Sequence, residues 1–468
     1  MAQTGNEISS KIRQMVERAR AAQRQIEFYS QEQIDELVAA AGWEVYKIEH
    51  AEACARLAHE ETGLGIYQDK LLKHQKKILG TLRDLDGEKS VGVIEEIPEK
   101  GLMKVCKPVG VVGALIPVTN PTSSVGCNGL AILKNRNAMI FAPHPKGKGC
   151  SGLAAKYMRD GVEKAGAPGD LIQWIDEPSV ELTQELMSAV DVVVATGGPA
   201  MVKAAYSSGT PAYGVGAGNA TVVVDETADL ADAADKIFKG KTFDHATSCS
   251  SENSIVVQAD IYDKLMQELK KLGGYLCSAE EKVKVRSALW PDGHTLNRKI
   301  VAQAPEVIAD AAGISIPQGT RFIMVEAEKV GPEELFAGEK LSLVLAVWKY
   351  DTFEDAIRYV RDITGFSGYG HSCGIHSTSD NNIRELAIRA PVSRMMVRQP
   401  QSHANSGNYD NGMPFSLTLG CGSWGNNITT ENIRHTHFRN ITWVSTPIPP
   451  VVPDENTIFG SHWKKYGK

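Results

Sequence analysis

Strand-like apolar runs alternate with helical stretches over most of this chain, and no other feature constrains its fold as strongly. Residues 109–118 form a continuously apolar run, typical of a strand buried on both faces of a parallel sheet. Further on, AMIFAP (138–143) precedes a helical stretch over 149–166, and DVVVATGG (191–198) leads directly into the helical PAMVKAAYSSG. This repetition predicts an α/β fold with a doubly wound parallel sheet, whose ligands bind at the carboxyl ends of the strands.

A second strand–helix series begins near residue 245. SIVVQ (254–258) precedes a helical stretch over 260–272, and LSLVLAVWKY (341–350) precedes TFEDAIRYVRD. A chain of 468 residues has room for two or three domains. The pattern predicts a first domain over 1–243 with a β-hairpin arm near 90–110, a second domain over 244–430, and a segment over 431–468 whose strand-like NITWVST joins the arm.

Charge and composition exclude several classes of partner. The chain has 50 Lys+Arg against 56 Asp+Glu and a net charge of −6, so no overall basic field would attract nucleic acid or an anionic membrane. It lacks a secretory signal pattern and a long apolar stretch, which favours a cytoplasmic protein. The eight cysteines show neither a CxxC pair nor a Cys/His ligand spacing, which predicts free thiols and no metal site.

Cys249 is the candidate nucleophile. It lies in FDHATSCSSENS, a run of small polar residues at the junction of the two expected domains and immediately before a strand. A thiol attacks only as the thiolate, and in a polar, partly open loop its pKa can fall. Most cysteines are inert small hydrophobes, but Ser248, Ser250 and Ser251 argue against an apolar site here.

Asn120 and a glycine pair are candidate binding groups. Asn120 follows the buried strand in LIPVTNPT, where Pro117 and Pro121 stiffen the backbone, so its amide N–H could donate to an oxyanion. The alternative is an asparagine that only completes a turn. Gly197 and Gly198 of ATGGPA stand at a strand-to-helix junction, where a pyrophosphate can approach a helix N-terminus, although such a pair is more often only a turn.

Taken together, these segments resemble the CoA-acylating branch of the aldehyde dehydrogenase superfamily. The resemblance is carried by LIPVTNP (115–121), FAPHPK (141–146), VVATGGPAMVKAAYSSGTPAYGVGAGN (193–219), TSCSSENS (247–254), GHSCGIHS (370–377) and LTLGCGSWGNN (417–427). It implies an enzyme with two doubly wound parallel-sheet domains, the first binding NAD or NADP and the second carrying the cysteine. It also implies an oligomerisation arm that augments a neighbouring subunit's sheet in a homodimer or homotetramer.

The same resemblance assigns roles to single residues. Cys249 attacks the aldehyde, the thiohemiacetal delivers hydride to the nicotinamide, and a thioester forms on Cys249; Asn120 and the Cys249 backbone N–H bind the oxyanion. Glu339 holds the nicotinamide ribose. The residues expected to bind the cofactor are Pro117, Thr119, His144, Lys146, Gly197, Gly198 and Glu339.

An absent residue indicates where the acyl group goes. Hydrolytic members of the superfamily have a glutamate base in the segment corresponding to YGVGAGN, and Gly214 stands about where that glutamate would be. Without a base, water is poorly activated. The thioester is then expected to survive until coenzyme A, as cosubstrate, takes up the acyl group through its thiol.

The choice between NAD and NADP stays open in the sequence. In hydrolytic relatives the segment matching FAPHPKGKG carries a ribose-binding lysine followed by an acid, and His144 and Gly147 stand at those positions here. An acid normally excludes a 2′-phosphate, whereas Lys146 and Lys148 could accept one. Surface lysines are usually only solvated, so both cofactors remain candidates.

Arginines between 384 and 398 suggest an anionic aldehyde. RELAIRAPVSRMMVR contains four arginines and one acid, and Arg398 stands where many relatives have a neutral asparagine. Its guanidinium, with Arg394 nearby, could bind a sulfonate or carboxylate, although such arginines also form surface or interface ion pairs. The chain resembles acylating succinate-semialdehyde dehydrogenases through much of its length and acylating sulfoacetaldehyde dehydrogenases more closely around 393–427, which predicts sulfoacetaldehyde as the substrate.

Other functions stay open at this point. Acetaldehyde or propionaldehyde could replace the anionic aldehyde, and a reductase of acyl phosphates would share the fold and the thiol. A non-catalytic scaffold relative is a different class of function, against which the retained Cys249, Asn120 and Glu339 argue.

Overall fold

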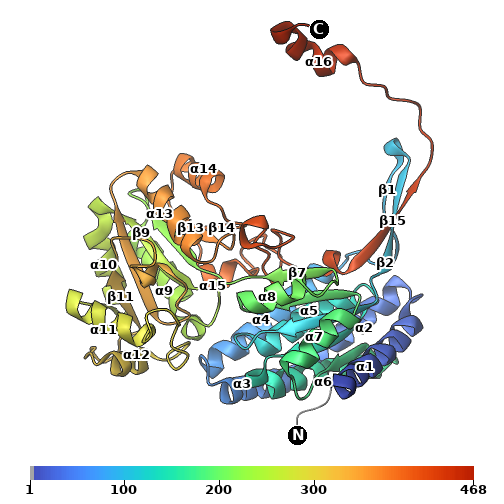
Figure 1. Cartoon of the computed structure of the whole chain (residues 1–468), viewed down its shortest axis with the longest axis horizontal. Helices are drawn as coiled ribbons and strands as arrows, with labels where there is room; N and C mark the ends of the chain where they lie inside the picture. Colours follow the sequence, from blue (N-terminus) through green and yellow to red (C-terminus); the bar gives the residue numbers. More distant parts are fainter. Residues whose placement is uncertain (1–4) are drawn as a thin grey trace.

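The computed structural model describes residues 5–468 and consists of two α/β lobes and an extended arm (Figure 1). Each lobe is built around its own parallel sheet and its own cluster of buried apolar side chains. The third sheet is antiparallel and forms the arm. The predicted fold class is therefore confirmed. The first four residues of the expected first domain lie outside the described residues.

The first lobe contains a five-stranded parallel sheet in the order β5-β4-β3-β6-β7. Its strands are β3 (Val111–Ile116), β4 (Ala138–Pro143), β5 (Ile172–Trp174), β6 (Val192–Thr196) and β7 (Ala212–Val215). Every residue of β3 and β4 is buried, as the continuous apolar runs predict. The order changes direction after β3, so the carboxyl ends of β3 and β6 flank the crevice in which such sheets bind ligands.

Helices cover both faces of this sheet. One group consists of α1 (Gly5–Ile26), α7 (Val180–Ala189) and α8 (Pro199–Tyr206). The other contains α5 (Pro121–Leu133) and α6 (Lys148–Lys164). Three further helices pack outside α5 and α6: α2 (Gln31–Tyr46), α3 (Ile48–Thr62) and α4 (Tyr67–Leu85). The helix α5 is buried along its whole length because α4 covers it. One face of α4 consequently points into the protein although it carries lysines.

The second lobe contains a seven-stranded parallel sheet in the order β10-β11-β12-β9-β8-β13-β14. Its strands are β8 (Ala220–Val224), β9 (Glu252–Gln258), β10 (Gly274–Leu276), β11 (Phe322–Glu326), β12 (Val344–Tyr350), β13 (Cys373–His376) and β14 (Met395–Val397). Its helices are α9 (Leu230–Thr242), α10 (Tyr262–Lys271), α11 (Ala279–Leu289), α12 (Pro305–Ala312), α13 (Phe353–Phe366), α14 (Asp380–Arg389) and α15 (Gln401–Ala404).

The domain boundary was expected between residues 243 and 244, but the structure places the crossing between the lobes nearer to the N-terminus. The strand β8 pairs with β9 and β13, and α9 packs on α10 and β9, so both belong to the second lobe. The crossing between lobes therefore falls in the segment between β7 and β8, at about the glycine-rich YGVGAGN.

The arm is a three-stranded antiparallel sheet. The hairpin of β1 (Gly92–Ile97) and β2 (Leu102–Pro108) pairs through β2 with β15 (Arg439–Ser445), and the chain ends in α16 (Glu455–Tyr466), far from both lobes (Figure 1). Short 3₁₀ helices complete the structure at Pro98–Lys100, Pro145–Gly147, Gly169–Leu171, Phe243–Ala246, Ala259–Ile261, Leu335–Ala337, Ser423–Gly425 and His435–His437. Within residues 5–468, no helix has the length and apolar character needed to cross a membrane.

Candidate active site

Asn120 stands at the carboxyl end of β3 and at the N-cap position of α5. Its side chain makes no capping hydrogen bond, which speaks against the alternative of an asparagine that only completes a turn. Its Oδ1 accepts a hydrogen bond from Lys73 Nζ at 2.7 Å, and its Nδ2 donates to Thr119 Oγ1 at 3.3 Å. An amide nitrogen has two N–H groups, so one of them remains for a ligand.

Lys73 connects Asn120 to the second lobe. Its ammonium is buried and lies 2.6 Å from Asp244 Oδ2, which also pairs with Lys70 at 3.3 Å. The other oxygen of Asp244 accepts the Ile66 N–H at 2.9 Å. Burial would raise the pKa of Asp244, but the two lysines and this backbone bond hold it below its ordinary value, so the buried carboxylate is charged.

Cys249 lies in the loop between α9 and β9, at the amino-terminal edge of the second sheet. The loop is entered through a left-handed turn in which Asp244, His245 and Ala246 all have positive φ values of 49°, 50° and 59°. Non-glycine residues keep this conformation only when their surroundings enforce it. Here the backbone N–H of Asp244 donates to Asp69 while its carboxylate is held by α4, so α4 fixes the approach to Cys249.

Gly218 allows the crossing segment to approach Cys249. A Cβ atom at Gly218 would lie 1.9 Å from the carbonyl oxygen of Cys249, so no other residue fits there without movement. A Cβ at Gly214 would meet Val202 and Tyr206 at 2.6–2.7 Å, so the position where hydrolytic relatives have a glutamate is closed by packing. The YGVGAGN glycines therefore place backbone, and no carboxylate, beside the cysteine.

The expectation of a lowered thiol pKa is not met. Burial, assisted by the nearby Glu339 and Cys421, raises the pKa of Cys249 to about 12, although a Ser250 hydrogen bond and the Arg394 charge act in the opposite direction. The flanking serines do not solvate the thiol because Ser250 and Ser251 are themselves buried. Cys249 is therefore a neutral thiol at pH 7 in the unliganded protein.

Glu339 lies five residues before β12, on the same edge of the sheet as Cys249. Burial raises the pKa of Glu339 to about 8, although the backbone N–H of Gly218 donates a hydrogen bond to it and acts to lower that pKa. Its Oε1 is buried without a hydrogen-bond partner. An unpartnered carboxyl oxygen beside the cysteine fits the expected contact with a ribose hydroxyl.

The two arginines expected to bind the substrate lie at opposite edges of the second sheet. Arg394 precedes β14 on the Cys249 edge, but its guanidinium donates to the backbone oxygens of His371, Gly420 and Thr430 and holds the surrounding loops. Arg398 follows β14, about 13 Å further along the strand direction. It is exposed and donates to the Ser377 oxygen at 2.6 Å.

The interpretation of Arg398 as the residue that selects the substrate anion therefore disagrees with its position. The strands run parallel, so a residue after β14 lies at the far edge from the loop before β9. Arg394 lies on the correct edge; three carbonyl groups accept from its terminal nitrogens, whereas its Nε is buried without a hydrogen-bond partner and its charge acts on Cys249.

Apart from Glu339, which lies in the second lobe, the residues expected to bind the dinucleotide lie together at the carboxyl edge of the first sheet. Pro117 and Thr119 follow β3, His144 and Lys146 follow β4, and Gly197 and Gly198 follow β6. Gly198 is the N-cap of α8 with φ −65°, and a Cβ there would meet nothing within 4 Å. Neither backbone conformation nor internal packing requires this glycine, so the open space before α8 fits a pyrophosphate.

The neighbourhood of His144 narrows the choice of groups for a 2′-phosphate. Lys148 is paired with Glu177, and Glu61 accepts the backbone N–H groups of Gly149 and Cys150 at 2.7 Å each, so both are engaged within the protein. Lys146 is exposed and is the lysine left available beside His144, whose Nδ1 accepts the Lys146 N–H.

A small pocket joins Asn120 to Ser248, the residue next to Cys249. Its lining residues are Lys73, Lys76, Lys77, Asn120, Phe243, Ser248, Ser402, His403, Ser406 and Leu417. Lys73, Lys76 and Lys77 share one face of α4 because they are three and four residues apart. Sequence reasoning missed all three, since a lysine-rich helix face is ordinarily a solvated one.

The three lysines differ in what they hold. Lys73 binds Asn120 and Asp244, whereas Lys77 donates to the backbone oxygens of His403, Ser406 and Gly407, and burial lowers its pKa to about 7. In the part of the chain that the structure describes, the Lys76 ammonium has neither an ion pair nor a hydrogen bond; it lies 6.0 Å from the Tyr409 ring. Burial lowers its pKa, against the charge of the exposed Asp410. Lys76 is therefore the cation left free to meet a ligand.

Several polar groups of the pocket lack a charge or a hydrogen-bond partner of their own. Burial lowers the pKa of His403 to about 4, and the charges of Lys76, Lys77 and Lys73 contribute, so this imidazole is neutral at pH 7. The Ser402 hydroxyl is buried without a hydrogen-bond partner. A free ammonium, a neutral imidazole and an unpartnered hydroxyl are groups that an anion would satisfy.

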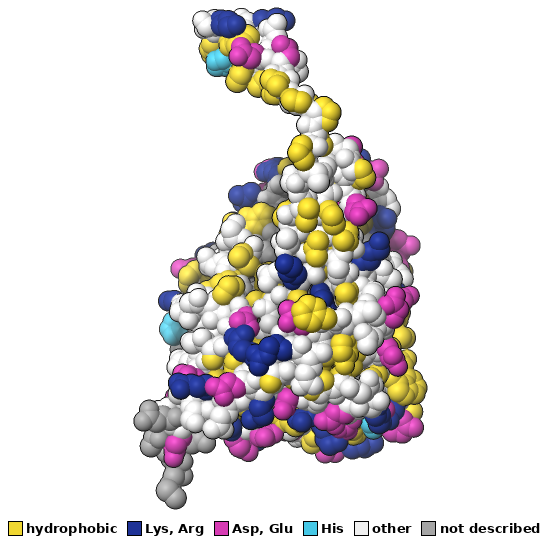
Figure 2. Space-filling model, turned by 90° about the vertical axis from the view of Figure 1, so that its right-hand side faces the viewer, with side chains coloured by type: hydrophobic (Ala, Val, Ile, Leu, Met, Phe, Trp, Pro, Cys, Tyr) yellow, Lys and Arg dark blue, Asp and Glu magenta, His cyan; other side chains and the backbone are white. Residues whose placement is uncertain are grey.

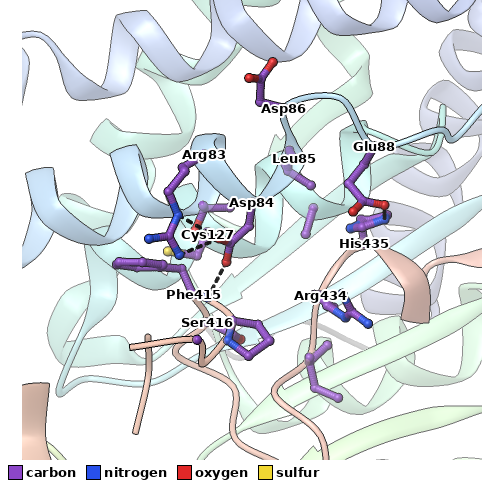
Figure 3. A pocket seen from close by; sticks show the side chains of 15 residues that line it. Arg83, Asp84, Leu85, Asp86, Glu88, Cys127, Phe415, Ser416, Arg434 and His435 are labelled. Carbon is purple, nitrogen blue, oxygen red and sulfur yellow. Dashed lines mark hydrogen bonds and ion pairs between the residues drawn. The ribbon is translucent and has the colours of Figure 1, made fainter. Parts of the chain in front are cut away.

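A larger hollow lies elsewhere, between the end of α4 and the loops at 412–416 and 433–435 (Figure 3). In it Arg83 donates to Asp84, Asp84 accepts the Phe415 N–H at 2.6 Å, and His435 lies 3.4 Å from Glu88. Burial lowers the pKa of His435 to about 3, so its imidazole is neutral beside Glu88, and none of the site residues expected from the sequence lines this hollow. The lysine-lined pocket is therefore the better candidate for the active site.

Metal binding finds no support in the side-chain arrangement. Over residues 5–468, no group of three or more His, Cys, Asp or Glu side chains is placed to hold a metal ion. The eight cysteines are all free in the same range.

Comparison with known proteins supplies the context for this site. Residues 1–276 match the model of the aldehyde dehydrogenase family, and residues 170–416 match that of the acyl-CoA reductase LuxC. A sulfoacetaldehyde dehydrogenase of Acholeplasma sp is 49% identical over 96% of this chain and 94% of its own length. An acylating sulfoacetaldehyde dehydrogenase of Bilophila wadsworthia is 47% identical over 98% and 99%.

Two further relatives extend the comparison. An acetylating succinate-semialdehyde dehydrogenase of Clostridium kluyveri is 43% identical over 93% of this chain and 95% of its own. The crystal structure of an acetylating aldehyde dehydrogenase from Geobacillus thermoglucosidasius superposes with a TM-score of 0.93 at 39% identity, covering 97% of this chain and 100% of that one.

Proposed function

Because this chain belongs to the aldehyde dehydrogenase family and is a CoA-acylating aldehyde dehydrogenase, we propose that it oxidises a short anionic aldehyde, sulfoacetaldehyde, to its CoA thioester. The observation that carries the substrate is the pocket between Asn120 and Ser248, where Lys76 forms no ion pair with any of residues 5–468, although the charge of Asp410 acts on it. The two sulfoacetaldehyde dehydrogenases at 47–49% identity support the same choice.

The chemistry begins at Cys249. The thiol first gives up its proton to solvent, and the thiolate then attacks the aldehyde carbon. The oxygen of the resulting thiohemiacetal accepts hydrogen bonds from the free N–H of Asn120 Nδ2 and from the Cys249 backbone N–H. When bound, the oxidised nicotinamide supplies a hydride acceptor. Loss of hydride from the thiohemiacetal carbon and collapse of its oxyanion leave a thioester on Cys249, which the thiolate of coenzyme A attacks to release the acyl-CoA and the free cysteine.

Two features favour CoA over water as the acceptor. Gly214 offers no carboxylate, and a side chain there would collide with Val202 and Tyr206. Glu339 lies near Cys249, but it is held by the Gly218 N–H and is assigned to the nicotinamide ribose. Water in this site therefore lacks a dedicated base.

Cofactor binding is proposed for residues at the first sheet's carboxyl edge, together with Glu339 of the second lobe. Gly197 and Gly198 would face the pyrophosphate, Pro117 and Thr119 the nicotinamide half, His144 the adenosine ribose, and Glu339 the nicotinamide ribose. Lys146 would meet a 2′-phosphate, so NADP⁺ is accommodated as well as NAD⁺.

The length of the substrate follows from the spacing on α4. Lys73 contacts Asn120 directly, and Lys76 lies about 4.5 Å further along the helix axis. A short substrate whose anionic group is one carbon away from the aldehyde would place that anion near these lysines. Succinate semialdehyde, the substrate named for the Clostridium kluyveri relative, is longer and is the alternative that the kinetic comparison tests.

Replacement of Lys76 tests the substrate assignment. We expect Lys76→Met to lower kcat/KM for sulfoacetaldehyde by about 10- to 100-fold, because a charge-assisted contact to the anion is lost. The loss is expected mainly in KM, and the kcat/KM for acetaldehyde is expected to change little. Steady-state rates of NAD⁺ or NADP⁺ reduction with each aldehyde, at saturating CoA, measure this ratio.

A matched charge deletion provides the control. Arg398→Ala removes the cation at the opposite edge of the sheet and should leave the preference for sulfoacetaldehyde unchanged. Lys76→Arg keeps the positive charge and should retain most of the preference. The proposal is contradicted if Arg398→Ala, and not Lys76→Met, abolishes discrimination between the charged and the neutral aldehyde.

The exposed arm and tail support a homo-oligomer. Figure 2 shows apolar side chains gathered along the arm and along the tail, the segment 446–468 that follows β15. In the tail, Val451, Val452, Ile458 and Phe459 are all exposed. The outer edges of β1 and β15 are also unpaired within the described chain. A second copy of the chain would cover both, and the free cysteines accord with the cytoplasmic location that the sequence predicts.

Deleting the tail tests this assembly. The intact protein is expected to run at two or more times the mass of the 50.7 kDa chain in light scattering after size exclusion. Removal of residues 447–468 leaves β15 in place and should shift the protein toward smaller species. A monodisperse monomer of the intact chain would contradict the oligomer.

A further inference from the structure

We propose that Lys73 is a positioning residue that fixes the orientation of the Asn120 amide toward the active-site pocket. The inference rests on the proposed function of Asn120 as an oxyanion donor. It concerns a side chain that the sequence analysis did not single out. This side chain lies on α4, which comes before β3 and Asn120 in the chain.

The chemistry of the two side chains determines the orientation. An asparagine amide can rotate by half a turn and exchange its oxygen for its nitrogen, and the two ends have opposite hydrogen-bonding character. The Lys73 ammonium donates and never accepts, so it can face only the amide oxygen. The 2.7 Å contact between Lys73 Nζ and Asn120 Oδ1 therefore leaves Nδ2 to face the pocket.

The lysine is itself held in place. Asp244 lies 2.6 Å from Lys73 Nζ, and its carboxylate is fixed by Lys70 and by the Ile66 N–H. Lys73 is 4% exposed, so water does not compete for the ammonium. With Asn120 and Asp244 as acceptors, the ammonium has two directional bonds that define its place.

The same bonds tie the donor to the nucleophile's loop. Asp244 begins the left-handed turn that leads to Cys249 five residues later. Lys73 consequently connects the residue that binds the oxyanion to the segment that presents the thiol. This hydrogen-bonded connection joins the two lobes, so the sequence of neither segment alone indicates it.

Loss of this contact has a specific expected consequence. In Lys73→Met the amide is free to turn its oxygen toward the developing oxyanion, which repels it. We expect kcat to fall by about tenfold or more, up to the roughly 10²- to 10³-fold loss that follows removal of an oxyanion donor. The fall should be similar for sulfoacetaldehyde and acetaldehyde, since the oxyanion is common to both, in contrast to the selective effect of Lys76→Met.

A double-mutant cycle of Lys73→Met with Asn120→Ala tests the inference. Without the Asn120 amide there is nothing to orient, so Lys73→Met should lower kcat far less in the Asn120→Ala background than in the wild-type protein. Lys73→Arg, which keeps a donor-only group, should recover part of kcat. Thermal unfolding of each variant accompanies the kinetics, because a purely structural lysine would lower stability and kcat together and independently of Asn120.

The outcomes separate this inference from the function on which it rests. If Lys73→Met lowers kcat by the same factor in both backgrounds, the positioning role is overturned while the role of Asn120 stands. If Asn120→Ala keeps the wild-type kcat, the proposed oxyanion donor fails and the positioning role fails with it. Non-additive losses with partial recovery by arginine are the result that the inference requires.

Discussion

Cys249→Ala is expected to abolish aldehyde oxidation, with a loss of about 10⁴-fold or more in kcat, because the group that forms the covalent intermediate is removed. Cys421 is the cysteine whose charge acts on Cys249, but it is buried and its Sγ donates to the Leu419 oxygen. The measurement is CoA-dependent cofactor reduction, combined with mass spectrometry of acid-quenched enzyme. The wild-type protein should carry an acyl adduct on Cys249 when CoA is omitted, and the variant should carry none.

The same residue gives a pH dependence whose direction is fixed. Because the pKa of Cys249 is raised to about 12 in the unliganded protein, the thiolate fraction grows about tenfold per pH unit between roughly pH 6 and 9. Alkylation of Cys249 by iodoacetamide should accelerate accordingly and show no plateau in that range. Cys277 is half-buried, and burial raises its pKa to about 12 as well, so it serves as the internal reference. Rapid labelling of Cys249 that does not vary with pH would contradict this account of the thiol.

Asn120→Ala is expected to lower kcat by about 10²- to 10³-fold while KM for the aldehyde changes little, since the donor acts on charge that develops only after the attack. Asn120→Asp replaces the donor by an acceptor beside Lys73 and should be at least as damaging. Kinetics with sulfoacetaldehyde and acetaldehyde measure whether both lose the same factor.

Two outcomes would oppose this role for Asn120. A change confined to KM would indicate a substrate contact in place of an oxyanion donor. A loss restricted to sulfoacetaldehyde would indicate that the amide binds the sulfonate. Asn128 is buried in α5 without a direct contact to Lys73, and Asn128→Ala serves as a stability control for the same helix.

The fold was predictable from the sequence because its signals are local. Continuous apolar runs such as residues 109–118 became strands buried on both faces, and the strand–helix alternation became two parallel sheets. The boundary between the lobes was less accessible. The strand β8 follows β7 after only four residues, and nothing in its composition tells that it pairs with β9 in place of β7.

The site was only partly predictable, for reasons that differ from residue to residue. Asn120, Cys249 and Glu339 were recognisable from short motifs. The raised pKa of Cys249 depends on burial by distant segments, which small polar neighbours do not reveal. Arg394 and Arg398 are close in sequence, yet the three-residue strand β14 places them at opposite edges of the sheet.

The lysines of α4 escaped prediction because their burial is a tertiary property. The segment 71–77, LLKHQKK, has the pattern of a solvated face of an amphipathic helix. In the structure this face is buried because it packs against α5 and the 403–407 loop. The pairing of Lys73 with Asp244 joins residues 171 positions apart. Such a contact carries no local sequence signal.

The most direct test of the central claim is cofactor reduction by the purified protein with sulfoacetaldehyde, succinate semialdehyde and acetaldehyde, each with and without CoA. The account predicts sustained turnover only when CoA is present, the highest kcat/KM for sulfoacetaldehyde, and sulfoacetyl-CoA as the product. Sustained turnover without CoA would contradict the acylating chemistry at Cys249. A preference for acetaldehyde would contradict the anion-binding role of the lysine-lined pocket.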